Sequence, residues 1–143
     1  MNIKSLCLTL FVVFVGVFAS DFLIHGVWLK SAYAETANLW RPEKEMQAHM
    51  GWMMLGQFMA AAAMVVLWAR GFAADACPRC AVLYGLFMGL FAQATSLINF
   101  AVMPLPADLI VKWFIAGIAQ SVALGLLMFF VYKPGPKATE TAH

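Results

Sequence analysis

The sequence predicts an all-α membrane protein whose four transmembrane helices form an up-down-up-down bundle. Of its 143 residues, 64% are hydrophobic and only 11% are charged, whereas a soluble domain carries about 25% charged residues. Four separate apolar runs reach the ~20 residues that cross a ~30 Å hydrocarbon core. The five tryptophans lie at or just beyond the ends of these runs, where interfacial aromatic residues collect. We therefore expect residues 1–143 to form a single membrane domain.

The four apolar runs cover approximately residues 6–28, 50–69, 81–103 and 109–132, with Asp21 and Lys112 as the formally charged residues inside them. The first run, followed by Ala32-Tyr33-Ala34, also resembles a cleavable signal peptide. It is longer than the usual apolar region of 7–15 residues in such a peptide. We therefore expect it to be retained as a membrane span.

The links between the spans are short, apart from residues 29–49. Within that loop, Pro42 and the charged residues after it predict a short interfacial helix over about 42–49, because proline is tolerated at the first helical position. The last link, residues 104–108, is a tight turn whose Asp108 is well placed to cap the fourth helix. Residues 133–143 form a polar tail that we expect to be disordered.

An even number of spans places both chain ends on the same side of the membrane. That side would carry Lys4, Arg70, Arg79, Lys133 and Lys137 in short segments. The opposite side would carry Lys30, Arg41, Lys44 and Lys112, three of them in one loop with several glutamates. Because short cytoplasmic segments hold an excess of Lys and Arg, we expect both termini in the cytoplasm.

Small residues recur every four positions in the last two spans. They are Ala81, Gly85 and Gly89 in the third, and Gly117, Ser121 and Gly125 in the fourth. Such stripes let helix backbones approach closely. The simplest prediction is a hairpin of these two spans packed stripe against stripe; a contact between two copies of the chain is the alternative.

Several segments resemble those of a known group of proteins. MNIK at residues 1–4, DFLIHGV at 21–27, LWRPEKEM at 39–46 and PLP at 104–106 are similar to segments of small four-span bacterial membrane proteins of uncharacterised function. The resemblance covers nearly the whole chain and implies four spans in a bacterial inner membrane. It implies no activity, substrate, cofactor or catalytic residue.

Polar residues gather in one half of the predicted bundle, the half away from the termini. Asp21 is the most informative, because a carboxylate at the centre of a span costs ~2.5–3.5 kcal/mol and must face protein, water or a partner charge. The cluster could be a structural cap in which Asp21 pairs with Lys112 or His25, or a pathway for protons or ions. Its members are Asp21, His25, His49, Gln57, Gln93, Ser96, Asn99, Lys112 and Gln120.

A bound divalent metal is a further interpretation of the same region. Asp21 and His25 share a helix face because they are four residues apart, and Glu45 and His49 repeat the spacing. Together they could supply four ligands to Zn²⁺, Fe²⁺ or Mn²⁺, although no cofactor is predicted as the leading interpretation. Thioethers suit Cu(I), but core packing explains the methionines of the second span better: Met46, Met50, Met53, Met54, Met59 and Met64.

Cys77-Pro78-Arg79-Cys80 is a C-x-x-C motif at the start of the third span. Thiols at a helix N-terminus beside an arginine are more reactive, and Cys7 lies near the same membrane face. Redox chemistry, metal handling and a structural role remain open for these cysteines. A lasting disulfide is disfavoured if the motif faces the cytoplasm.

The sequence favours a non-enzymatic accessory or assembly component of the membrane. The lipid bilayer is its environment, and a second copy or another membrane protein would be its partner; a net charge of +2 gives no reason to expect nucleic acid. No nucleotide-binding loop or acyl-transfer motif occurs in the sequence. One alternative is a transporter or channel that moves protons or small cations through the polar cluster. Another is a thiol or metal protein that uses Cys77 and Cys80.

Overall fold

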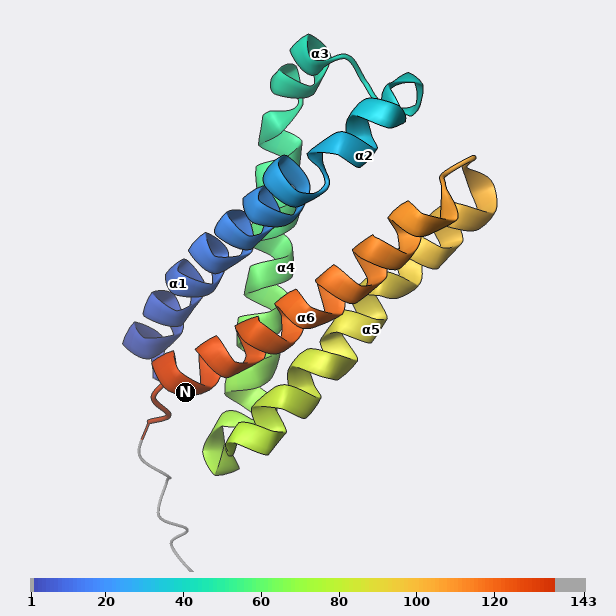
Figure 1. The fold of residues 1–143 in the computed structure, drawn as a ribbon. Helices are drawn as coiled ribbons and strands as arrows, with labels where there is room; N and C mark the ends of the chain where they lie inside the picture. Colours follow the sequence, from blue (N-terminus) through green and yellow to red (C-terminus); the bar gives the residue numbers. More distant parts are fainter. Residues whose placement is uncertain (1, 136–143) are drawn as a thin grey trace, which may run out of the picture.

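The structure, a computed structural model, describes residues 2–135 as a set of helices. Its long helices are α1 (Ile3–Asp21) continued by η1 (Phe22–Trp28), α4 (Met50–Gly71), α5 (Pro78–Val102) and α6 (Ala107–Val131). All four units are long and apolar enough to cross a membrane. They run in alternating directions (Figure 1). The predicted all-α, four-span bundle is confirmed.

Shorter elements join these helices. The long loop contains α2 (Lys30–Glu35), η2 (Ala37–Leu39) and α3 (Glu43–Ala48), and η3 (Ala73–Asp75) joins α4 to α5. The helix α3 lies where a short helix was expected, but Pro42 precedes it as the N-cap instead of opening it. Of the predicted disordered tail, residues 133–135 are non-helical and residues 136–143 lie outside the described residues.

The prediction that Asp108 caps the fourth helix is wrong. Pro106 is the N-cap of α6, and Asp108 lies in its first turn. There the carboxylate forms an ion pair with Lys112 Nζ at 2.9 Å, one helical turn away. A negative charge in the first turn still favours the helix, because it faces the positive end of the helix dipole.

The apolar core occupies the half of the bundle nearest the chain termini. There the phenol of Tyr84 donates to the carbonyl of Met64 at 2.6 Å, and its ring packs edge-on to that of Trp68. The backbone N–H of Lys133 donates to Ser5 Oγ at 2.6 Å, which ties the end of α6 to the start of α1. Core residues come from all four spans: Val13, Val17, Ala61, Val65, Trp68, Ala81, Tyr84, Leu124 and Met128.

The predicted hairpin of small-residue stripes is confirmed in α5 and α6. A Cβ added to Gly85 would lie 2.6 Å from Val122 Cα, and one added to Gly89 would lie 2.9 Å from Ile118 Cα. One added to Gly125 would lie 2.5 Å from the carbonyl oxygen of Ala81. The stripes therefore bring the two backbones together within one chain, so they do not need a second copy to cover them.

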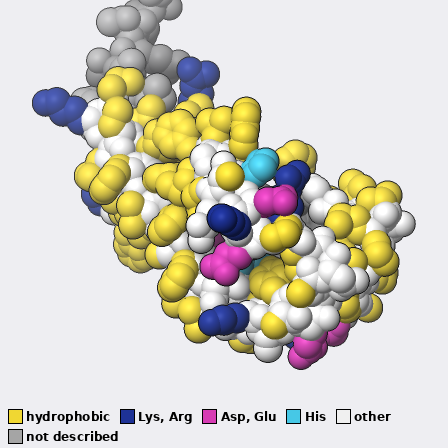
Figure 2. All heavy atoms as spheres, turned by 90° about the horizontal axis from the view of Figure 1, so that it is seen from above, with side chains coloured by type: hydrophobic (Ala, Val, Ile, Leu, Met, Phe, Trp, Pro, Cys, Tyr) yellow, Lys and Arg dark blue, Asp and Glu magenta, His cyan; other side chains and the backbone are white. Residues whose placement is uncertain are grey.

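Large apolar side chains cover the flanks of the molecule, and charged side chains gather over the end that carries α2 and α3 (Figure 2). This distribution suits a helix bundle whose solvent is lipid along its sides and water at its ends. The structure agrees with core packing for only part of the methionine series. Met64 of α4 is buried, but Met46 of α3 and Met50, Met53 and Met59 of α4 are exposed, so core packing does not explain these four.

We predict that Gly85→Ala destabilises the protein, because its new methyl group would meet the backbone of α6. Overpacking of this kind costs about 1–3 kcal/mol. Gly56→Ala in α4 is the matched control, since no atom lies within 4 Å of a Cβ added there. Alanine favours a helix by up to about 1 kcal/mol over glycine. Unfolding in mild detergent measures the stability of both variants. Equal stability of the two would contradict the close contact of Gly85 with the backbone of α6.

Candidate functional site

Asp21 lies at the end of α1, where its carboxylate is bonded by two other helices. Oδ2 accepts a hydrogen bond from Gln57 Nε2 of α4, and Oδ1 accepts one from Gln120 Nε2 of α6, both at 2.6 Å. The same Gln120 nitrogen is 2.7 Å from Ser20 Oγ. Hydrogen bonds to a carboxylate are roughly twice as strong as neutral ones. Asp21 therefore connects three of the four spans.

The proposed ion pair between Asp21 and Lys112 is wrong. Lys112 pairs with Asp108, and within residues 2–135 no lysine or arginine bonds to Asp21. In the described part of the chain no hydrogen bond joins His25 to Asp21 either; its Nδ1 lies 2.6 Å from the hydroxyl of Tyr33. The carboxylate is thus solvated by amide N–H groups and has no cationic partner among the described residues.

Beside Asp21, a cavity of about 260 Å³ opens between α1, η1, α5 and α6. We call it the polar cavity. It confirms that part of the predicted polar cluster is brought together in space, while His49, Asn99 and Lys112 do not line it. Its polar and aromatic lining includes Asp21, His25, Gln93, Ser96, Trp113 and Gln120.

A second hollow of about 500 Å³, which we call the apolar pocket, lies on the α4 side of the same residues. Asp21 and His25 line both hollows, so the carboxylate stands between them. Gln57 lines the apolar pocket together with Phe18, Phe22, Gly26, Met50 and Met53. Among the described residues, Gln57 Oε1 is a buried side-chain oxygen without a hydrogen-bond partner.

An aromatic cluster borders the polar cavity at the end away from the termini. Trp113 Nε1 donates to the Tyr33 hydroxyl at 2.8 Å. The same hydroxyl lies 2.6 Å from His25 Nδ1, and which of these two groups donates depends on the tautomer of the imidazole. Burial raises the pKa of Tyr33, although the bond from Trp113 lowers it in part. The phenol therefore stays protonated at neutral pH.

A π-helical segment sets the direction of His25. In η1, Leu29 N–H donates to the carbonyl of Ile24 at 2.8 Å, five residues back. Such wide turns are rare and occur often at functional sites. The sequence carried no signal for η1. It also gave no reason to select Tyr33, Trp40 and Trp113, whose rings lie 5.4–6.4 Å from one another.

The four residues of the predicted metal site are not assembled. Glu45 and His49 are exposed on and after α3, and His49 Nδ1 lies 2.8 Å from the backbone carbonyl oxygen of Glu45. Over residues 2–135 there is no group of three or more His, Cys, Asp or Glu side chains that could hold a metal ion. Asp21 and His25 alone join the polar cavity.

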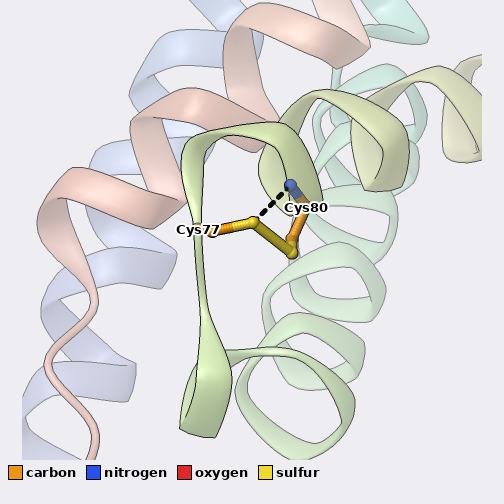
Figure 3. Close-up of a disulfide and its surroundings, with 2 residues drawn as sticks. All are labelled: Cys77 and Cys80. Carbon is orange, nitrogen blue, oxygen red and sulfur yellow. Dashed lines mark hydrogen bonds between the residues drawn. A yellow bond between two sulfur atoms is a disulfide. The ribbon is translucent and has the colours of Figure 1, made fainter.

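The C-x-x-C motif forms the start of α5. Pro78 is the first residue of the helix, as predicted, and Cys77 is its N-cap, whose Sγ accepts a hydrogen bond from the Cys80 N–H at 3.1 Å. Cys77 and Cys80 are joined by a disulfide, which was not expected for a cytoplasmic motif (Figure 3). Cys7 is a free, exposed cysteine on α1. The three sulfurs therefore do not form one site.

No protein family, curated protein or solved structure matches the chain. The interpretation of the site rests on its geometry.

We predict that Gln120→Met lowers the stability of the bundle, because it removes the donor to Asp21 and Ser20 while keeping most of the side-chain volume. A hydrogen bond to a charged group contributes about 1.5–3 kcal/mol. Gln47→Met on the exposed face of α3 serves as the control. The two variants are compared by their free energies of unfolding in detergent. If Gln120→Met loses no more stability than Gln47→Met, the hydrogen bonds of Gln120 do not stabilise the contact between α1 and α6.

We also predict that alkylation of the denatured, unreduced protein modifies Cys7 alone. After reduction, Cys77 and Cys80 should react as well, because their disulfide no longer blocks them. Intact-mass spectrometry counts the added groups, and Cys7→Ser provides the control that should take up none before reduction. Alkylation of all three cysteines without a reductant would show that the disulfide is open in the membrane.

Proposed function

We propose that the chain is a small multi-pass transport protein of a bacterial inner membrane, which binds protons or small cations at Asp21 and moves them through the polar cavity. The observation that carries this proposal is a half-buried carboxylate that borders a cavity and has no cationic partner among the described residues. Ionisable groups inside membrane spans are costly, and they commonly mark ion or proton pathways.

The two halves of the bundle support a transporter over a purely accessory protein. An accessory bundle would be expected to pack tightly along its whole length, whereas here the apolar core that joins all four spans lies in the half near the termini. Toward the other end, the buried apolar side chains are Leu29, Leu105, Leu109 and Ile110. The other half holds two hollows that meet at Asp21. A cation can therefore reach the carboxylate from one side, while the core closes the path toward the other.

Three side chains would do the work of binding. Asp21 provides the negative charge, and the amides of Gln57 and Gln120 hold its two oxygens in place. Because these amides are neutral donors, they stabilise the carboxylate without cancelling its charge. The charge distribution favours both termini in the cytoplasm, which would turn the polar cavity to the outer side of the membrane. The Cys77–Cys80 disulfide lies on the side of the termini and favours the opposite orientation.

We predict that Asp21→Asn abolishes cation movement. In proteoliposomes that contain a pH-sensitive dye, an imposed membrane potential should drive proton or cation flux through the natural chain. Flux through the asparagine variant should be at least about tenfold lower, since a neutral amide neither takes up a proton nor attracts a cation. Flux that is equal in the variant and the natural chain would overturn the proposal.

Glu45→Gln is the matched control for this experiment. It removes the same kind of charge from an exposed position on α3, outside both hollows. Its flux should equal that of the natural chain. A loss of flux of the same size in both variants would point to surface charge instead of a binding group.

A further inference from the structure

We infer that the cation bound at Asp21 is a protonated organic amine with an apolar substituent. This inference rests on the proposed function and names the class of its substrate. It is carried by three features that meet at one place: a carboxylate without a counter-charge, an unpartnered amide oxygen, and an apolar pocket beside them.

The groups around Asp21 do not suit Mg²⁺ or Ca²⁺. Mg²⁺ and Ca²⁺ require about six or more oxygen ligands, yet the groups turned toward the carboxylate are the N–H donors of Gln57 and Gln120. The described residues also contain no cluster of three metal-ligating side chains. A carboxylate has about four acceptor sites, so two remain after these bonds for the N–H groups of an ammonium ion.

The side-chain oxygen Oε1 of Gln57 could accept a hydrogen bond from a ligand. Its amide nitrogen is used by Asp21, while its Oε1 is buried and unsatisfied in the described part of the chain. Leaving such an acceptor without a partner costs about 1–3 kcal/mol. An ammonium group bound at the carboxylate in the apolar pocket would give one N–H to Asp21, and a turn of the buried Gln57 amide would let its oxygen accept another. A quaternary ammonium ion has no N–H and would satisfy neither.

The residues that line the two hollows indicate which other groups the ligand carries. On the α4 side, the rings of Phe18 and Phe22 and the thioethers of Met50 and Met53 line a pocket of about 500 Å³. An aryl or alkyl substituent would be buried there. On the other side, Trp113 lines the polar cavity, and an indole face attracts organic cations. The geometry thus fits a molecule with a charged amine at one end and an apolar group at the other.

The test compares three ligands of one shape on the full-length protein in lipid nanodiscs. They are 2-phenylethylamine, its trimethylammonium analogue and the neutral 2-phenylethanol, and empty nanodiscs correct for partition into lipid. Isothermal titration calorimetry should show the amine binding about tenfold tighter than the quaternary ion, the factor expected for a charge-assisted hydrogen bond. The alcohol should not bind measurably. Equal affinity of the three ligands would overturn the inference.

Variants then assign the contacts. Asp21→Asn should abolish binding of both cations. Gln57→Leu should lower the affinity for the amine to that for the quaternary ion. Gln47→Leu, on the surface, should leave both affinities unchanged. Amine binding unaffected by Asp21→Asn would overturn the inference. If no amine binds but cation flux still depends on Asp21, the inference fails and the proposed function stands. If neither flux nor binding depends on Asp21, both fail.

Discussion

The need to solvate one carboxylate inside the membrane governs the arrangement of the helices. Lipid offers Asp21 no hydrogen bonds, so its charge must be compensated by the protein itself. Gln57 and Gln120 provide this from α4 and α6. These bonds and the apolar core together hold α1 against both helices. Neither of these two donors is charged, so they hold the carboxyl group of Asp21 without forming an ion pair.

The remaining architecture divides into a closed half and an open half. Near the termini, glycines allow α5 and α6 to touch through their backbones, and Trp68, Tyr84 and Met128 fill the space against α1 and α4. Toward α2 and α3 the same helices carry polar side chains, which cannot fill a dry core without partners. Two hollows remain there, and both reach Asp21.

The loop after α1 completes the open half. The π-helical turn of η1 directs His25 toward Tyr33 of α2, and Tyr33 in turn accepts a bond from Trp113 of α6. Tyr33, which lies outside the predicted spans, thereby connects the first and last spans at a point separate from Asp21.

The sequence by itself determined the four spans, the small-residue hairpin and the importance of Asp21, because hydropathy, four-residue spacing and the cost of a buried charge depend on local composition. Only the tertiary structure decided the partners of that charge. Gln57 and Gln120 are 36 and 99 residues from Asp21, and no local pattern distinguishes them from Lys112, which instead pairs one turn away with Asp108. The π-helix and the Tyr33–Trp113 contact were likewise beyond the sequence, since both depend on how distant segments meet.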